Sequence, residues 1–244
     1  MLFFYMLVNG VSLDIASLLI KNTTSVRSTI NRKFHEWIDN KIIYDTYNKI
    51  QTNYMNNNII TEAYIDSTDI MNANCDHKYT GKSIKLKKQA LKLSFICDQN
   101  KVPISPYQLD KPIVHDSRTG FEVIIQTNMN NNKPTNLAGD KGYILDKQTR
   151  EQLLKTKGIR LICPKKKYIK KKVYKTKNYK YIKERIRHSK QMKNTLTNRI
   201  YVEHTNNAIH RSFKRLDKIF DRKIESFEGF IDLAFSIITL MKTI

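Results

Sequence analysis

The sequence contains few cysteines and no recognisable metal or nucleotide motif built on them. Cys75, Cys97 and Cys163 stand singly, without a Cys-x-x-Cys pair or a neighbouring histidine cluster. This spacing argues against a disulfide framework and a zinc site, and we expect Cys97 and Cys163 to be small buried residues at strand ends. Residues 139–142 read Gly-Asp-Lys-Gly, which lacks the spacing and the Lys-Ser/Thr ending of a P-loop.

Long apolar runs are also missing. The apolar residues 1–8 have no positively charged segment before them, and Asn9, Gly10 and Asp14 interrupt the run before the roughly 20 residues that a membrane span needs. We therefore expect an intracellular chain with no membrane partner, in which residues 1–20 form a buried helix or the stump of a longer N-terminal region. The sequence does not distinguish cytoplasm or nucleoid from nucleus.

Acidic residues are scarce relative to basic ones. The chain has 22 Asp and Glu against 44 Lys and Arg, a formal charge of +22 at pH 7. Each phosphate that a lysine or arginine neutralises releases condensed counterions, so this charge predicts a nucleic-acid partner bound with strongly salt-dependent affinity. The charge alone does not separate a nuclease from a ribosomal-type binder or a membrane-surface protein.

Much of the charge is concentrated in residues 165–193. This segment holds fourteen Lys or Arg against one acid, Glu184, with four tyrosines interleaved. Repulsion between like charges favours an extended or loosely helical chain, and tyrosines can stack on unpaired bases. We interpret the segment as a basic insert that follows DNA phosphates, the alternative being a solvated charge run. Its candidate DNA-binding residues are Lys165, Lys166, Lys167, Lys170, Lys171 and Lys172.

Hydrophobic periodicity divides the chain into two regions. Residues 1–58 form an N-terminal helical region, with a helix expected over residues 22–50 and a polar loop over residues 51–58. Residues 59–244 contain the elements of an α/β domain that carries the basic insert. In order, they are strands at 62–68, 90–97 and 103–109, a helix at 117–127, a strand at 135–139, a helix from Asp146 to Gly158, a strand at 159–163, and helices at 197–220 and 226–240.

This order of elements is typical of the ribonuclease H-like topology, an α/β fold with a five-stranded mixed sheet flanked by helices. In that topology the first strand pairs with the fourth, about 4.8 Å away, so carboxylates at corresponding ends can share a site. Asp66 and Asp140 occupy these positions. By contrast, we expect Asp69 and Asp76 to be loop acids and Asp116 or Ser117 to be a helix cap.

A third candidate acid, Glu203, lies on a predicted helix. Arg199, Glu203, Asn206 and His210 fall on one face of it, at spacings of four, three and four residues. Carboxylates from separate elements can hold two Mg²⁺ or Mn²⁺ ions, the arrangement used in two-metal phosphoryl transfer.

The sequence around these acids resembles insertion-sequence DDE transposases over about residues 60–240. The resemblance is carried by AYIDST at residues 63–68, His115-Asp116-Ser117, LAGDKGY at residues 137–143 and VEHTNN at residues 202–207. It implies that Asp66, Asp140 and Glu203 are the catalytic metal ligands for two Mg²⁺ or Mn²⁺ ions, and that Lys141 and Arg199 contact DNA phosphate.

The implied reaction is attack of water on a phosphodiester at the ends of a mobile element, which leaves a 3′-hydroxyl that attacks target DNA. The implied partners are transposon ends and target DNA, with a homodimer in a transposition complex as one assembly that the resemblance allows.

The sequence departs from the family signature at two positions. A tyrosine is common three residues before the arginine and a lysine seven residues after the glutamate, where this chain has Leu196 and His210. A neutral imidazole at His210 would bind phosphate more weakly than lysine. The alternatives are therefore a decayed, non-catalytic transposase-derived DNA-binding protein, or a general nucleic-acid-binding factor with an accidental resemblance.

Overall fold

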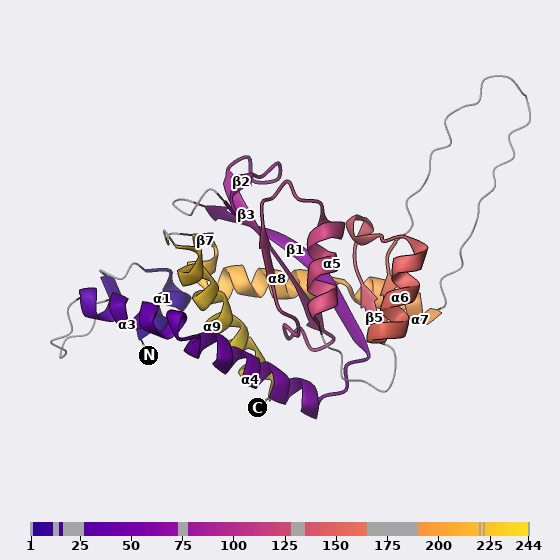
Figure 1. Cartoon of the computed structure of the whole chain (residues 1–244), viewed down its shortest axis with the longest axis horizontal. Helices are drawn as coiled ribbons and strands as arrows, with labels where there is room; N and C mark the ends of the chain where they lie inside the picture. Colours follow the sequence, from indigo (N-terminus) through magenta and orange to yellow (C-terminus); the bar gives the residue numbers. More distant parts are fainter. Residues whose placement is uncertain are drawn as a thin grey trace, which may run out of the picture.

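The computed structural model describes residues 2–11, 15–16, 27–72, 78–127, 135–164, 190–219, 221 and 223–243. Within these ranges a mixed sheet is built around β1 (Glu62–Asn72), in the order β2-β3-β1-β5-β6, with β4 beside β3 and β7 beside β1 (Figure 1). The remaining strands are β2 (Gly81–Lys82), β3 (Gln89–Asp98), β4 (Gln108–Asp110), β5 (Thr135–Ala138), β6 (Ile159–Ile162) and β7 (Lys218–Ile219).

The sheet topology confirms the predicted fold. β1 pairs with β3 in antiparallel and with β5 in parallel orientation, and β6 continues the parallel side. The order β4-β3-β1-β5-β6 is the ribonuclease H-like order, to which the short strands β2 and β7 add two members beyond the predicted five.

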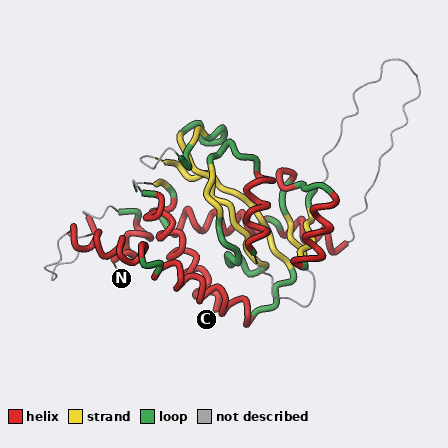
Figure 2. Tube along the Cα trace, viewed as in Figure 1, coloured by secondary structure: helices red, strands yellow, loops and turns green. Residues whose placement is uncertain are grey.

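Helices cover both faces of the sheet (Figure 2). On one face lie α5 (Asp116–Gln126) and α6 (Lys147–Lys157), which share a core with Ile65 of β1. On the other lie α8 (Ile200–Ser212) and α9 (Ile224–Thr243), and Phe235 of α9 packs 5.1 Å from the ring of Phe95 in β3. Both faces of β3 are thus covered, which explains why almost every residue of it is buried.

Local signals set the ends of α6 as the sequence predicts. Asp146 caps its first turn by accepting a hydrogen bond from Thr149 N at 2.9 Å, and Gly158 ends it with a left-handed φ of 64°. Cys97 is buried in β3, as expected, whereas Cys163, which follows β6, is only partly buried.

The prediction for the N-terminal region was wrong in two respects. The expected single helix is two, α3 (Arg27–Asp39) and α4 (Ile42–Asn57), separated at Lys41, whose φ is 56°. Residues 51–57 of the expected loop over residues 51–58 are instead the last part of α4. Tyr54 accounts for this, because its hydroxyl donates a 2.6 Å hydrogen bond to Asp98 at the end of β3 and is buried there.

These helices, together with α1 (Leu2–Asn9), pack with the C-terminal part of the chain. α1, α3 and α4 all contact α9, beside which α4 runs in Figure 1. The expected helix over residues 197–220 was also wrong: α7 (Lys190–Asn198) precedes α8, and α8 ends at Ser212 before the short 3-10 turn η2 (Lys214–Leu216) and β7.

Several predictions concern residues outside the described ranges. They include Cys75, Asp76 and the six lysines of the basic insert, Lys165, Lys166, Lys167, Lys170, Lys171 and Lys172. Among the helices that the structure describes, none has both the length and the apolar character needed to cross a membrane.

Candidate active site

Strand register brings Asp66 and Asp140 to the same level of the sheet. Tyr64 of β1 pairs with Ala138, the last residue of β5, and each acid stands two residues beyond that pair. Asp66 shares its face of β1 with Tyr64 and Ile70, which belong to the core on the α8 side. Asp140 opens the short 3-10 turn η1 (Lys141–Tyr143) and accepts a 2.6 Å hydrogen bond from Gly142 N.

The polar face of α8 lies over this part of β1. Asn206 Nδ2 donates to Asp66 Oδ2 at 3.2 Å, and His210 Nε2 lies 3.0 Å from Thr68 Oγ1. Glu203 lies one helical turn before Asn206, and its Oε1 forms a 2.6 Å ion pair with the guanidinium of Arg199. The predicted face of Arg199, Glu203, Asn206 and His210 therefore borders the strand that carries Asp66.

The electrostatics of Asp66 link the three acids. Burial, more than any other cause, raises the pKa of Asp66, which reaches about 6. The charges of Asp140 and Glu203 add to this rise, and a hydrogen bond from the Ser67 backbone and the charge of Arg199 oppose it. The site therefore concentrates negative charge in a partly desolvated place, with one arginine as its neighbour.

The donor chemistry of this site fits a hard divalent cation. Asp66, Asp140 and Glu203 offer carboxylate oxygens, and Asn206 Oδ1, whose amide nitrogen already contacts Asp66, is buried without a hydrogen-bond partner. Convergence is incomplete, since in the described part of the chain no three His, Cys, Asp or Glu side chains are grouped closely enough to hold a metal ion. Glu203, whose side chain is 44% exposed, is turned to Arg199 instead.

The residues predicted to contact DNA phosphate differ in how far they are exposed to solvent. Lys141 is exposed in the turn directly after Asp140. His210 is partly enclosed, and burial lowers the pKa of its imidazole although Asp217, 3.4 Å away, favours the protonated ring. A largely neutral His210 beside Thr68 is poorly suited to the role that a lysine would play there.

Sequence reasoning missed the part played by Asp116. The cap of α5 is His115, whose ring accepts from Ser117 N, whereas the Asp116 carboxylate accepts from Lys92 Nζ at 2.7 Å and from Ser67 Oγ at 3.0 Å. A Cβ added to Gly142 would lie 2.8 Å from Asp140 Oδ1 and 2.9 Å from Asp116 Oδ2. The Asp116 side chain thus lies between Ser67, which follows Asp66 on β1, and the turn that contains Asp140.

A signal for this contact was present in the sequence. Lys92 stands in the middle of the apolar strand β3 and is only 7% exposed, and a lysine buried that deeply needs an anionic partner. The prediction for Asp69 was wrong as well, because this residue lies within β1, where its Oδ2 accepts a 2.5 Å hydrogen bond from Ser83.

Comparisons with known proteins agree with this geometry. The family model described as "Transposase DDE domain" matches residues 60–240. The solved structure of piggyBac transposase, in a synaptic complex with hairpin DNA, has a similar fold, with a TM-score of 0.54 and 11% sequence identity. The similarity covers 97% of this chain but 63% of that one, so the chain spans less than two thirds of its length. A search of curated proteins found no match.

The family match includes all the residues of the candidate site, from Asp66 on β1 to His210 on α8. It extends over well more than half of the chain. The chain therefore belongs to the transposase DDE domain family.

Proposed function

We propose that the chain is a DDE transposase that cuts DNA and transfers the cut strand, with Asp66, Asp140 and Glu203 as its catalytic carboxylates. The observation that carries the proposal is that the three acids come from separate elements on the same side of the sheet. β1 and the turn after β5 present Asp66 and Asp140 at one level, and α8, which carries Glu203, contacts Asp66 through Asn206.

The same three residues, with Asn206 Oδ1 beside them, are the proposed holders of two divalent ions, Mg²⁺ or Mn²⁺. When bound, these ions would supply activation of the attacking oxygen and stabilisation of the leaving oxygen. Asn206 orients the Asp66 carboxylate through its 3.2 Å hydrogen bond, and Gly142 N holds Asp140 at 2.6 Å.

Arg199 and Lys141 flank the acids as the proposed DNA contacts. The Arg199 guanidinium has more donors than its single 2.6 Å contact with Glu203 Oε1 requires, so it can also meet a phosphate oxygen. Lys141 is exposed beside Asp140. The net charge of +22 supports a DNA partner, as does the DNA present in the piggyBac transposase structure.

The ion pair between Arg199 and Glu203 favours one alternative, a transposase-derived protein that binds DNA without cutting it. In that case Glu203 would serve as the fixed partner of Arg199. The absence of the signature tyrosine at Leu196 and of the signature lysine at His210 would be signs of decay. This alternative predicts DNA binding that is independent of divalent metal ions.

Nicking of supercoiled plasmid by the full chain distinguishes the two. With Mg²⁺ or Mn²⁺ we expect nicks that carry 3′-hydroxyl ends, and Asp140→Asn should slow nicking by about 100-fold or more, since even residues that only support a metal ligand are worth about 10–100-fold. Asparagine can still accept from Gly142 N, so the turn is preserved. The control is Asp146→Asn, which changes the exposed cap of α6 and should nick at the wild-type rate. Equal nicking by Asp140→Asn would remove the site assignment, and no nicking by the wild-type chain would favour the alternative.

A further inference from the structure

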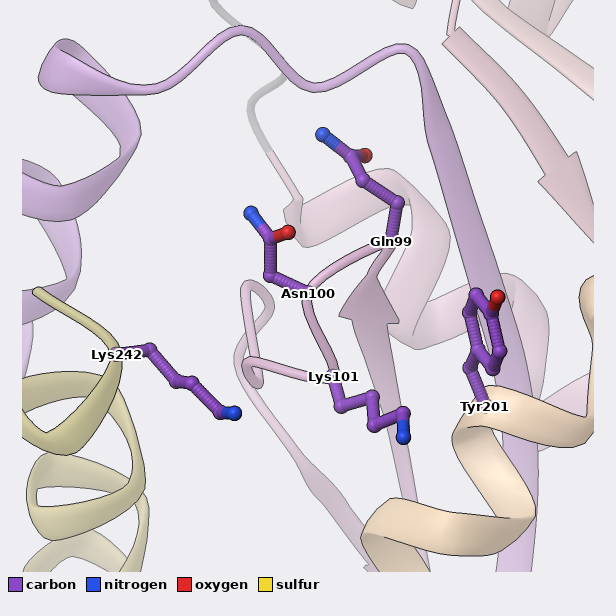
Figure 3. Close-up of a pocket in the computed structure, with 5 residues that line it drawn as sticks. All are labelled: Gln99, Asn100, Lys101, Tyr201 and Lys242. Carbon is purple, nitrogen blue, oxygen red and sulfur yellow. The ribbon is translucent and has the colours of Figure 1, made fainter.

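A cavity of about 380 Å³ lies outside the proposed active site, where three elements meet (Figure 3). The turn after β3 contributes Gln99, Asn100 and Lys101, the first turn of α8 contributes Tyr201, and the last turn of α9 contributes Lys242. Tyr201 stands two residues from Glu203, so on a helix it lies about 3 Å along the axis and roughly 200° around it. The cavity is therefore close to the acids but on another side of α8.

The described residues that line the cavity include two lysines and no acid. In Figure 3 the Lys242 side chain extends toward Lys101, and the Lys101 side chain extends toward Tyr201. Among the described residues, no carboxylate lies within ion-pair distance of either group. Two ammonium groups that pair with no carboxylate of the described residues, beside a small open cavity, suit a compact anion with several oxygen atoms.

The walls of the cavity are fixed by other contacts. Gln99 Nε2 donates to Ile59 O at 2.9 Å, and Asn100 Nδ2 donates to the Tyr54 hydroxyl at 3.0 Å. The Tyr201 ring meets the ring of Tyr64 edge-on, with centroids 5.7 Å apart. The amide and aromatic side chains are thus engaged in structure.

Lys101 occupies a backbone position that favours another residue. It closes the turn after β3, where its N–H donates to Asp98 O at 3.0 Å, and it has a left-handed φ of 68°. Glycine is the residue best suited to that conformation. Thr205 Oγ1 holds the Lys101 carbonyl at 3.2 Å, and the ammonium group lies 5.3 Å from the centre of the Tyr201 ring. The Lys101 side chain thus leaves the turn from a fixed backbone position at the edge of the cavity.

We propose that this cavity binds a backbone phosphate of DNA, with Lys101 and Lys242 as the lysines that contact it. The inference rests on the proposed function, because it assigns the phosphate to DNA held at the acids on the neighbouring side of α8. A DNA phosphate is favoured over a free one because the whole chain carries +22, which draws it to a polyanion.

The test is the salt dependence of DNA binding. Fluorescence anisotropy of a labelled duplex, measured in EDTA over a series of NaCl concentrations, gives the slope of log K against log salt. Each phosphate neutralised contributes about 0.9 to this slope. We expect Lys101→Gly and Lys242→Gln each to weaken binding, and the double variant to lose about 0.9 in total, because both lysines hold one phosphate.

Lys41→Gly is the matched control, since it removes an exposed lysine from the same left-handed conformation, at φ 56°, between α3 and α4. It should keep the wild-type slope. A double variant with the wild-type slope, a loss of about twice 0.9, or an equal loss in Lys41→Gly would each overturn the proposal. So would ³¹P NMR showing that the cavity variants lose only binding of inorganic phosphate while their DNA binding is unchanged.

Because binding is measured in EDTA, the result does not depend on cutting. Unchanged slopes in a protein that nicks plasmid would overturn the phosphate site alone. The expected loss of slope in a protein that never nicks would leave the cavity as a DNA contact and overturn the proposed function alone.

Discussion

Replacing Asp66 by asparagine should stabilise the metal-free protein at neutral and alkaline pH. Burial and the charges of Asp140 and Glu203 raise the pKa of Asp66 from its ordinary 3.8 to about 6. The folded chain therefore carries an ionised carboxylate at a cost. Asparagine removes that cost, and its side-chain oxygen can still accept the hydrogen bond from Asn206.

The pKa shift sets the size and the pH range of this gain. About two pKa units at 1.36 kcal/mol each give an upper limit of about 3 kcal/mol, and because the carboxyl is only partly buried, solvent screening reduces this to roughly 1–2 kcal/mol. Since the folded pKa lies above the unfolded one, the penalty on the wild type is absent below about pH 4 and develops fully above about pH 6. The difference in the free energy of unfolding between Asp66→Asn and wild type should have the same pH dependence.

Urea unfolding of both proteins, followed by circular dichroism from pH 4 to pH 8, measures the effect. Asp69→Asn is the control, because Asp69 is on the same strand but faces away from the acids toward Ser83. If the proposed site binds Mg²⁺, added Mg²⁺ should reverse the order at pH 7.5 by stabilising the wild type more than the variant. Equal stability of Asp66→Asn and wild type across the pH range, with and without Mg²⁺, would refute the reasoning about the site.

The remaining predictions concern three other positions. Lys101→Gly should raise the free energy of unfolding by about 0.5–1 kcal/mol, because glycine adopts the left-handed conformation without strain, and a loss of stability in urea would contradict this. Asp116→Ala should cost about 3 kcal/mol by leaving the ammonium of Lys92 buried without its carboxylate, and adding Lys92→Met should recover part of that loss in thermal unfolding. Burial raises the pKa of Asp232 to about 7. Asp232→Asn should therefore be more stable than wild type by about 2–4 kcal/mol at pH 9 and equally stable near pH 4, as measured by urea unfolding. Equal stability at both pH values would contradict this prediction.

The sheet and its flanking helices could be predicted because their signals are local. Alternating apolar residues mark β1 and β3, and the cap at Asp146 and the glycine at 158 mark the ends of α6. The last part of α4 could not be predicted in this way. Its polar, asparagine-rich sequence has the composition of a loop, and the contact that makes Tyr54 a core residue is made by Asp98, 44 positions away.

The same distinction applies to the candidate site. The level of Asp66 and Asp140 follows from the order of strands, and the face of α8 follows from residue spacing, so both could be anticipated. The contacts of Asp116 could not be anticipated. They join Ser67, Lys92 and the turn at Gly142, which are distant in sequence and meet only through the packing of α5 on the sheet. The cavity at Lys101 depends likewise on α9 ending beside the turn after β3.

Equilibrium titration with Mn²⁺ tests the central claim, that Asp66, Asp140 and Glu203 form one metal-binding site. Electron paramagnetic resonance of free Mn²⁺ gives the number bound and the affinity. We predict saturable binding of two ions per wild-type chain, with affinity reduced by about 10-fold or more in each of Asp66→Asn, Asp140→Asn and Glu203→Gln, and unchanged in Asp69→Asn. Wild-type affinity in all three variants, or no saturable binding by the wild-type chain, would contradict the claim.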